Sequence, residues 1–218
     1  NIALGYQALS ADTTGDRSTA LGFQTLANQN FTSNTDTYNT AVGYNAGVNV
    51  TTGLENTLIG GEAGDALTDA DFNVAVGRQA LSADTLGSRS VAIGWGALRV
   101  QNFTSATATY NTAVGMNAGA ALTTGVNNTL IGGLAGDALT AASSNTALGY
   151  AALSANCGSG NSAVGHVALV SSTGVYSTAL GYSAGSANTS GSNNLFLGKE
   201  AGLTGSPGGN ITTASNEI

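Results

Sequence analysis

A short repeat constrains this chain more than any other feature of its sequence. A five-residue core of the form Asn/Ser-x-apolar-apolar-Gly recurs twelve times in 218 residues, at intervals of 16, 17 or 21 residues. The cores begin at Asn1, Ser18, Asn39, Asn56, Asn73, Ser90, Asn111, Asn128, Asn145, Asn161, Ser177 and Asn194. A thirteenth copy starts at Asn216. Such regularity predicts a repeat architecture, in which each unit packs only on its neighbours.

A longer period is superimposed on the short one. Residues 1–72 and 73–144 align without a gap and are identical at 48 of 72 positions, whereas residues 145–218 are more divergent. This pattern indicates that a block of four units was duplicated. We therefore expect one repeat domain over residues 1–218, made of about 12 coils, and we interpret the chain as a fragment of a longer fibre.

The length of the unit decides the fold class. Helical repeats need 30 or more residues to hold two helices, and glycine inside a helix costs roughly 1 kcal/mol. Seventeen residues suit one coil of a β-solenoid, whose short strands pair with their equivalents in the next coil at a spacing of about 4.8 Å. We predict an all-β fold, a parallel β-solenoid or β-roll with 16–21-residue coils.

The pattern within the core suggests how copies of the chain associate. In residues 39–43, Val42 shares a strand face with Thr40, and Ala41 points the other way. Both central positions are apolar in every unit, so both faces of the strand are expected to be buried. One face fills the coil, and the small alanine suits close approach of a neighbouring chain. We therefore predict a homotrimer, with its chains intertwined or packed around a common axis.

Two positions of the core have structural roles that follow from their residue types. The recurrent Asn at the first position predicts a ladder of side-chain hydrogen bonds from coil to coil. The fifth position is Gly in all twelve units, which fits a turn with positive φ. These turn glycines are Gly5, Gly22, Gly43, Gly60, Gly77, Gly94, Gly115, Gly132, Gly149, Gly165, Gly181 and Gly198.

Composition excludes several classes of partner. The 12 acidic and 5 basic residues give a net charge of −7, and binding to nucleic acid or to an anionic membrane needs a basic face instead. The chain has no apolar run long enough to span a membrane, so we expect no membrane insertion in this segment. The single cysteine, Cys157, excludes an internal disulfide framework.

Few residues are candidates for chemistry. His166 is the only histidine and occupies a position where other units carry aromatic residues, so we expect a variable, half-exposed side chain. Cys157 precedes Gly158 with no basic neighbour and is expected to be an inert thiol. We therefore predict no catalytic residue, no bound cofactor and no enzymatic activity.

One acidic cluster is a candidate calcium site, because carboxylate oxygens suit that ion. Its members are Glu62, Asp65, Asp69 and Asp71. Only Asp65 has an acidic counterpart in the duplicated block, Asp137. A solvated acidic patch is therefore the favoured interpretation, and we predict no metal site.

The two 21-residue units carry extra residues at the same place, from Gln29 to Tyr38 and from Gln101 to Tyr110. Loops on a rigid scaffold are common binding sites, and aromatic rings stack on sugars or pack against proteins. The candidate receptor-contact residues are Phe31, Tyr38, Phe103 and Tyr110. For the two phenylalanines we favour the alternative that they fold back over a coil edge or a neighbouring chain. The divergent residues 202–209 are a possible third loop.

The Asn-Thr-Ala-Val-Gly cores resemble the head repeats of trimeric autotransporter adhesins, which stack as a left-handed parallel β-roll. The longer phrase at residues 39–53, Asn-Thr-Ala-Val-Gly-Tyr-Asn-Ala-Gly followed by Thr-Thr-Gly, is more similar to repeats in bacteriophage tail fibres. The resemblance covers residues 1–216, although units of 16 to 21 residues depart from the adhesin length of about 14. It implies a homotrimer located in a virion tail fibre, or else on a bacterial surface.

These observations favour a structural and adhesive role. We expect a rigid trimeric rod of a phage tail fibre that projects or forms a surface for a host glycan or protein. The head domain of a bacterial adhesin is one alternative. An ice-binding solenoid is another, because seven units have Thr at the second position. A polysaccharide-degrading tailspike would need paired carboxylates, and the sequence repeats no such pair.

Overall fold

The repeat folds into short parallel strands, one core strand per coil. The computed structural model describes residues 1–203, which form two compact units, Asn1–Tyr110 and the described part of Asn111–Ile218. Each unit contains six coils of the predicted parallel β-solenoid, so this prediction of the fold class is confirmed. The proposed thirteenth copy at Asn216 and most of the possible loop at 202–209 lie outside the described residues.

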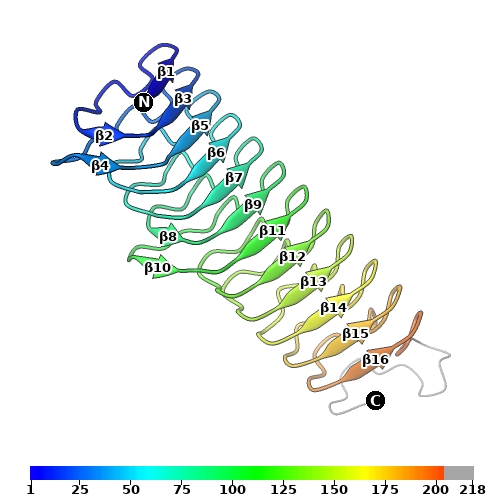
Figure 1. Ribbon diagram of the computed structural model, residues 1–218. Coiled ribbons are helices and arrows are strands. Elements are labelled where there is room, and N and C mark those ends of the chain that lie inside the picture. Colours follow the sequence, from blue (N-terminus) through cyan, green and yellow to red (C-terminus); the bar gives the residue numbers. More distant parts are fainter. Residues whose placement is uncertain (204–218) are drawn as a thin grey trace. The chain divides into compact units, whose positions relative to one another are not determined.

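In the first unit, six core strands pair in parallel with consecutive coils in register. They are β1 (Ile2–Leu4), β3 (Thr19–Leu21), β5 (Thr40–Val42), β6 (Thr57–Ile59), β7 (Val74–Val76) and β9 (Val91–Ile93). Four two-residue strands accompany them at one edge: β2 (Gly15–Asp16), β4 (Thr35–Asp36), β8 (Gly87–Ser88) and β10 (Thr107–Ala108) (Figure 1).

The second unit repeats the same ladder of core strands without the two-residue strands. Its six strands also pair in parallel and in register (Figure 1). They are β11 (Thr112–Val114), β12 (Thr129–Ile131), β13 (Thr146–Leu148), β14 (Ser162–Val164), β15 (Thr178–Leu180) and β16 (Leu195–Leu197).

The two faces of each core strand have roles opposite to those expected. The third position of the core, such as Ala20, Ala41 or Ala75, is buried in the interior of its coil in every unit except the first, where Ala3 is exposed. The fourth position faces outward, and Leu21 and Ile59 are 42 % and 38 % exposed. The expectation that the alanine face meets a neighbouring chain is therefore wrong. The interior has room only for a methyl group there, because leucines from other positions of the coil already fill it.

Those interior leucines come from either of two positions, nine or twelve residues into the unit. Where position nine is Leu, as at Leu81 and Leu98, position twelve is polar. Where position nine is Gly within residues 1–144, as at Gly64, position twelve supplies the apolar side chain instead, here Leu67. A Cβ on Gly64 would lie 2.8 Å from Leu67 Cδ1. In the eight coils of residues 1–144 the same space is thus filled once per coil, from alternative positions, whereas the coil with Gly185 has the buried Asn188 at position twelve.

The exceptions at position three obey the same volume limit. This position is large only at Leu58, Leu130 and Phe196. A Cβ on Gly64 would lie 2.7 Å from Leu58 Cδ2, and a Cβ on Gly47 in the preceding coil would lie 2.6 Å from Leu58 Cδ1. Large residues at position three therefore occur where that coil and the coil before it both have Gly at position nine.

The asparagines at the first position form the predicted ladder, and they form it inside the coils. Asn56 is fully buried, and its Oδ1 accepts a hydrogen bond from the backbone N–H of Asn73 at 3.0 Å. Its Nδ2 donates to the backbone oxygen of Ala70 at 2.8 Å, which closes its own coil. One side chain thus satisfies buried backbone groups in two successive coils, which keeps these buried amides from destabilising the core.

The turn after each strand requires glycine for two reasons. All twelve turn glycines have φ between 113° and 142°, a region that other residues rarely occupy. A Cβ on Gly60 would also lie 2.7 Å from the backbone carbonyl atoms of Gly77 in the next coil. The glycines therefore stack in a column where neighbouring backbones approach too closely for any side chain.

We predict that Gly60→Ala lowers the free energy of unfolding by about 2 to 4 kcal/mol, because it adds both a strained φ and a backbone clash. The neighbouring Gly61→Ala is the matched control, since its Cβ would meet no atom within 4 Å. Thermal and urea unfolding, followed by circular dichroism, measure the difference. Equal stability of the two variants would contradict this account of the column.

Candidate functional site

Each of the two inserted segments forms a separate two-stranded sheet at one edge of the first unit. In the first copy, β4 pairs with β2, and Thr35 and Asp36 lie opposite Gly15 and Asp16. In the second copy, β10 pairs with β8 in the same way. Each segment thus lies beside the coil before it, and the two copies occupy the same edge of the unit (Figure 1).

A buried polar cluster anchors each segment, and the sequence alone did not reveal it. In the second copy, Gln101 is fully buried and its Nε2 donates to Asp84 Oδ2 at 2.6 Å and to Ser90 Oγ at 2.9 Å. The hydroxyl of Ser90 in turn lies 2.6 Å from that of Thr109. Asp84 also accepts from the backbone N–H of Phe103 at 3.1 Å. The available signal was that both 21-residue units begin with Ser and carry Gln.

The four aromatic residues predicted to contact a receptor fall into two classes. Phe31 and Phe103 are only 9 % and 7 % exposed, so little of either ring is accessible to a ligand. Tyr38 and Tyr110 are 50 % and 56 % exposed. Each tyrosine is the last residue of its coil and has φ near 50°. The accessible part of each segment is thus its end.

The last residues of the coils in the first unit form a row of exposed side chains, which we call the closing row. Its members are Arg17, Tyr38, Glu55, Phe72, Arg89 and Tyr110. All have φ between 51° and 65°. Sequence reasoning missed this row, because its residue type varies from coil to coil.

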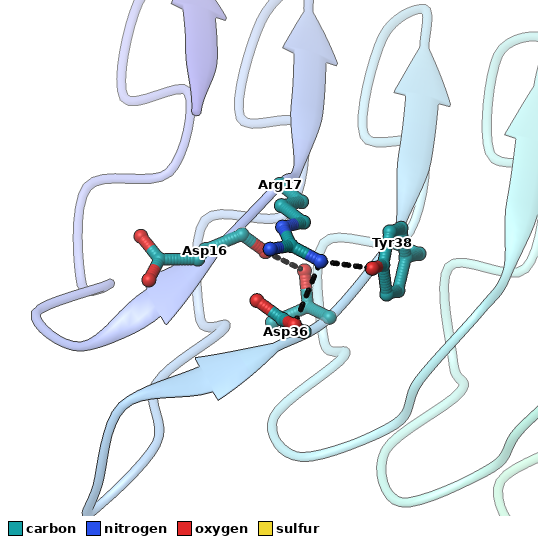
Figure 2. A network of polar contacts seen from close by, with 5 residues as sticks. Asp16, Arg17, Asp36 and Tyr38 are labelled. Atoms are coloured by element: carbon teal, nitrogen blue, oxygen red, sulfur yellow. Dashed lines mark hydrogen bonds and ion pairs between the residues drawn. The ribbon is translucent and has the colours of Figure 1, made fainter.

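In the first copy, the closing-row residues Arg17 and Tyr38 contact each other, and Arg17 also pairs with Asp36 (Figure 2). Arg17 Nη1 lies 2.8 Å from Asp36 Oδ2 and donates a hydrogen bond to the Tyr38 hydroxyl. The guanidinium carbon lies 5.3 Å from the centre of the Tyr38 ring. The hydrogen bond to Tyr38 and the charge of Asp36 both raise the pKa of Arg17. This arginine is fully engaged within the chain.

In the second copy the arginine has different neighbours. The guanidinium carbon of Arg89 lies 5.2 Å from the centre of the Phe72 ring and 5.8 Å from that of Tyr110. Both distances are within the range of a cation–π contact. The residue equivalent to Asp36 is Ala108, so no carboxylate from β10 faces Arg89.

The structure also shows the environments of the only histidine and the only cysteine of the chain. His166 is exposed and stacks between Tyr150 and Tyr182, with ring centres 5.4 and 5.2 Å apart. Cys157 is 4 % exposed, and burial raises the pKa of its thiol to about 11. At neutral pH the thiol therefore stays protonated, which is the unreactive form.

Three of the four carboxylates of the acidic cluster have separate partners, whereas Asp65 Oδ1 is buried without one among the residues that the structure describes. Glu62 accepts from Gln79 at 2.8 Å, Asp69 from the Thr52 hydroxyl at 2.6 Å, and Asp71 from the backbone N–H of Leu54 at 2.8 Å. Within residues 1–203, no three His, Cys, Asp or Glu side chains are arranged to hold a metal ion.

Comparisons with protein families, with curated proteins and with solved structures find no match for this chain. The part of the chain that the structure describes has no helix of the length and hydropathy needed to cross a membrane.

Asp65 provides a pH-dependent test of the acidic cluster. Burial, together with the nearby charge of Glu62, raises its pKa from 3.8 to about 6. Between these two values the folded chain binds more protons than the unfolded chain, so stability falls as the pH rises through this window. We predict that Asp65→Asn raises the free energy of unfolding at pH 7.5 by about 1 kcal/mol, allowing for screening of a half-buried group.

The gain from Asp65→Asn should disappear at pH 3.5, where the native carboxyl is protonated. Thermal unfolding at the two pH values measures it. Asp137→Asn is the comparison at the equivalent position, where Leu134 stands in place of Glu62, so a difference between the two variants reports the contribution of the Glu62 charge. A gain independent of pH would show that the charge of Asp65 is not its cause.

Proposed function

We propose that this chain is a structural and adhesive fibre segment, which acts as a homotrimeric rod in a phage tail fibre. The observation that carries the proposal is the outward face of the core strands. Residues at the fourth position of consecutive coils lie in register, as in the pairs Leu21↔Val42 and Val42↔Ile59. They form an apolar ribbon along each unit whose larger members are at least 36 % exposed. Its larger members are Leu4, Leu21, Ile59 and Ile93 in the first unit, and Ile131, Leu148, Leu180 and Leu197 in the second.

A continuous apolar face of this kind is costly in water and is typical of a surface that another molecule covers. A second and third copy of the same chain fit it well, because their ribbons have the same repeat spacing. The number three and the tail-fibre setting come from the resemblance of the cores to trimeric adhesin and tail-fibre repeats. In this arrangement the closing row of each chain remains the receptor-facing surface.

The oligomeric state tests the proposal directly. We expect light scattering after size-exclusion chromatography to give about three times the chain mass of 21.3 kDa, and the trimer to resist SDS. The double variant Ile59→Lys/Ile93→Lys should dissociate it while each chain keeps its β spectrum, because both side chains are exposed in the single chain.

Thr124→Lys is the control for that experiment, because it adds a positive charge at an exposed turn outside the core strands. A wild-type chain that runs as a stable monomer would overturn the trimer. A trimer that survives the double variant would show that the contact lies on another face.

A second candidate, ice binding, is favoured by one specific observation. Threonines at the second position also face outward, and they align from coil to coil, as in Thr19↔Thr40↔Thr57. An ice-contacting surface needs such an outward row of threonines, and valine interrupts this one at Val74 and Val91. We expect no thermal hysteresis from the pure protein, since leucine and isoleucine adjoin the row. A measurable hysteresis gap would favour ice binding over the fibre.

A further inference from the structure

The duplicated block contains a natural comparison between two versions of one site. Arg17 and Arg89 are equivalent residues, both exposed and with φ of 65° and 64°. Each follows a two-residue strand and precedes, by one coil, an exposed tyrosine of the closing row. The versions differ in charge, because Asp36 in the first copy corresponds to Ala108 in the second. The first site neutralises its own cation, and the second does not.

The surroundings of Arg89 leave its charge available to a ligand. Only two ion pairs form within residues 1–203, Arg17–Asp36 and Lys199–Glu200, so Arg89 takes part in neither. Asp71 of the preceding coil, whose backbone oxygen accepts from the Arg89 N–H at 3.0 Å, uses its Oδ1 to accept from the backbone N–H of Leu54. Arg89 is exposed, and Phe72 and Tyr110 on either side of it are 43 % and 56 % exposed.

The two rings determine which part of the guanidinium a ligand can reach. Where rings on two sides of a guanidinium lie over its faces, its N–H edge stays open for hydrogen bonds. That planar edge matches a carboxylate, which accepts two parallel hydrogen bonds from it. Beside it, the exposed parts of Phe72 and Tyr110 offer the apolar surface on which a sugar ring packs.

The acidity of the whole chain does not prevent such binding. Charges farther away than about 8 Å are largely screened at physiological ionic strength. The charges close to Arg89 therefore decide whether it can bind an anion, and no carboxylate of the described residues forms an ion pair with it.

We propose that Phe72, Arg89 and Tyr110 form a binding site for the carboxylate of an acidic polysaccharide. This inference rests on the receptor-facing surface in the proposed function and names the chemistry of the receptor. Arg89 binds the carboxylate through its N–H edge, and the two aromatic side chains position the guanidinium and contact the sugar ring.

Binding to immobilised polysaccharides tests the site. The probes are polygalacturonate, alginate, hyaluronan and polysialic acid, each beside its carboxyl-reduced form, with poly-glutamate as an acidic polypeptide. We expect the wild-type chain to bind at least one of the four polysaccharides and to lose at least tenfold in affinity for its carboxyl-reduced form. Binding to none of the four would overturn the proposal, and equal affinity for poly-glutamate would assign the site to acidic proteins instead.

The first copy of the block supplies the decisive variant. Ala108→Asp installs the carboxylate that Asp36 provides beside Arg17, so we expect it to fold normally and to weaken binding at least tenfold, as Arg89→Gln should. Asn102→Asp is the control, since it adds the same charge in the same segment and keeps an oxygen for the Thr85 hydroxyl, 3.1 Å away. Equal losses for Ala108→Asp and Asn102→Asp would mean that net charge, not this site, governs binding.

Measuring the oligomeric state of the same variants distinguishes failure of the binding site from failure of the proposed fibre. Light scattering on each variant reports the oligomeric state, and Ala108→Asp is expected to leave it unchanged. A trimer without affinity for the acidic polysaccharides would overturn the proposed binding site but not the proposed fibre function. A monomer that binds them through Arg89 would overturn the fibre and support the site.

Discussion

Each coil encloses so little space that side chains at three positions of the repeat compete for it. Position three is an alanine wherever a leucine at position nine fills the interior, and it becomes Leu58 where both neighbouring position-nine residues are glycine. The asparagine ladder is the polar counterpart of this packing, because a side chain such as Asn56 bonds the backbone of two coils from within. Volume and buried hydrogen bonds together explain why so few residue types recur.

Much of the fold follows from the sequence, because its repeat spacing reports the coil directly. The parallel register, the turn glycines and the asparagine ladder were all predictable from residues that recur at fixed positions. The orientation of the strand was not, since Ala41 and Val42 are both apolar and alternation alone cannot say which faces inward. Only the volume contributed by Val50 in the same coil, and by Leu26 and Leu58 in the coils on either side, decides it.

The candidate site was harder to foresee, because it depends on residues that differ between the copies. The inserted segments were visible as extra length, and the buried positions of Phe31 and Phe103 agree with the favoured alternative. The anchoring cluster around Gln101 and the pairing of Arg89 with two rings join residues up to 38 positions apart in sequence. No local pattern signals such contacts. The difference between Asp36 in the first copy and Ala108 in the second acquires a meaning only when the structure shows which arginine lies beside each position.

The alternation of leucine and glycine at position nine also bears on how such a chain changes length in evolution. The order Leu-Leu-Gly-Gly occurs three times, with the large position-three residue always in the fourth coil. Removing or adding a single coil by recombination would put this order out of phase and leave either a cavity or a clash. Exchange of four coils keeps the phase, so the array is expected to grow and shrink in steps of four, as the 72-residue duplication already shows.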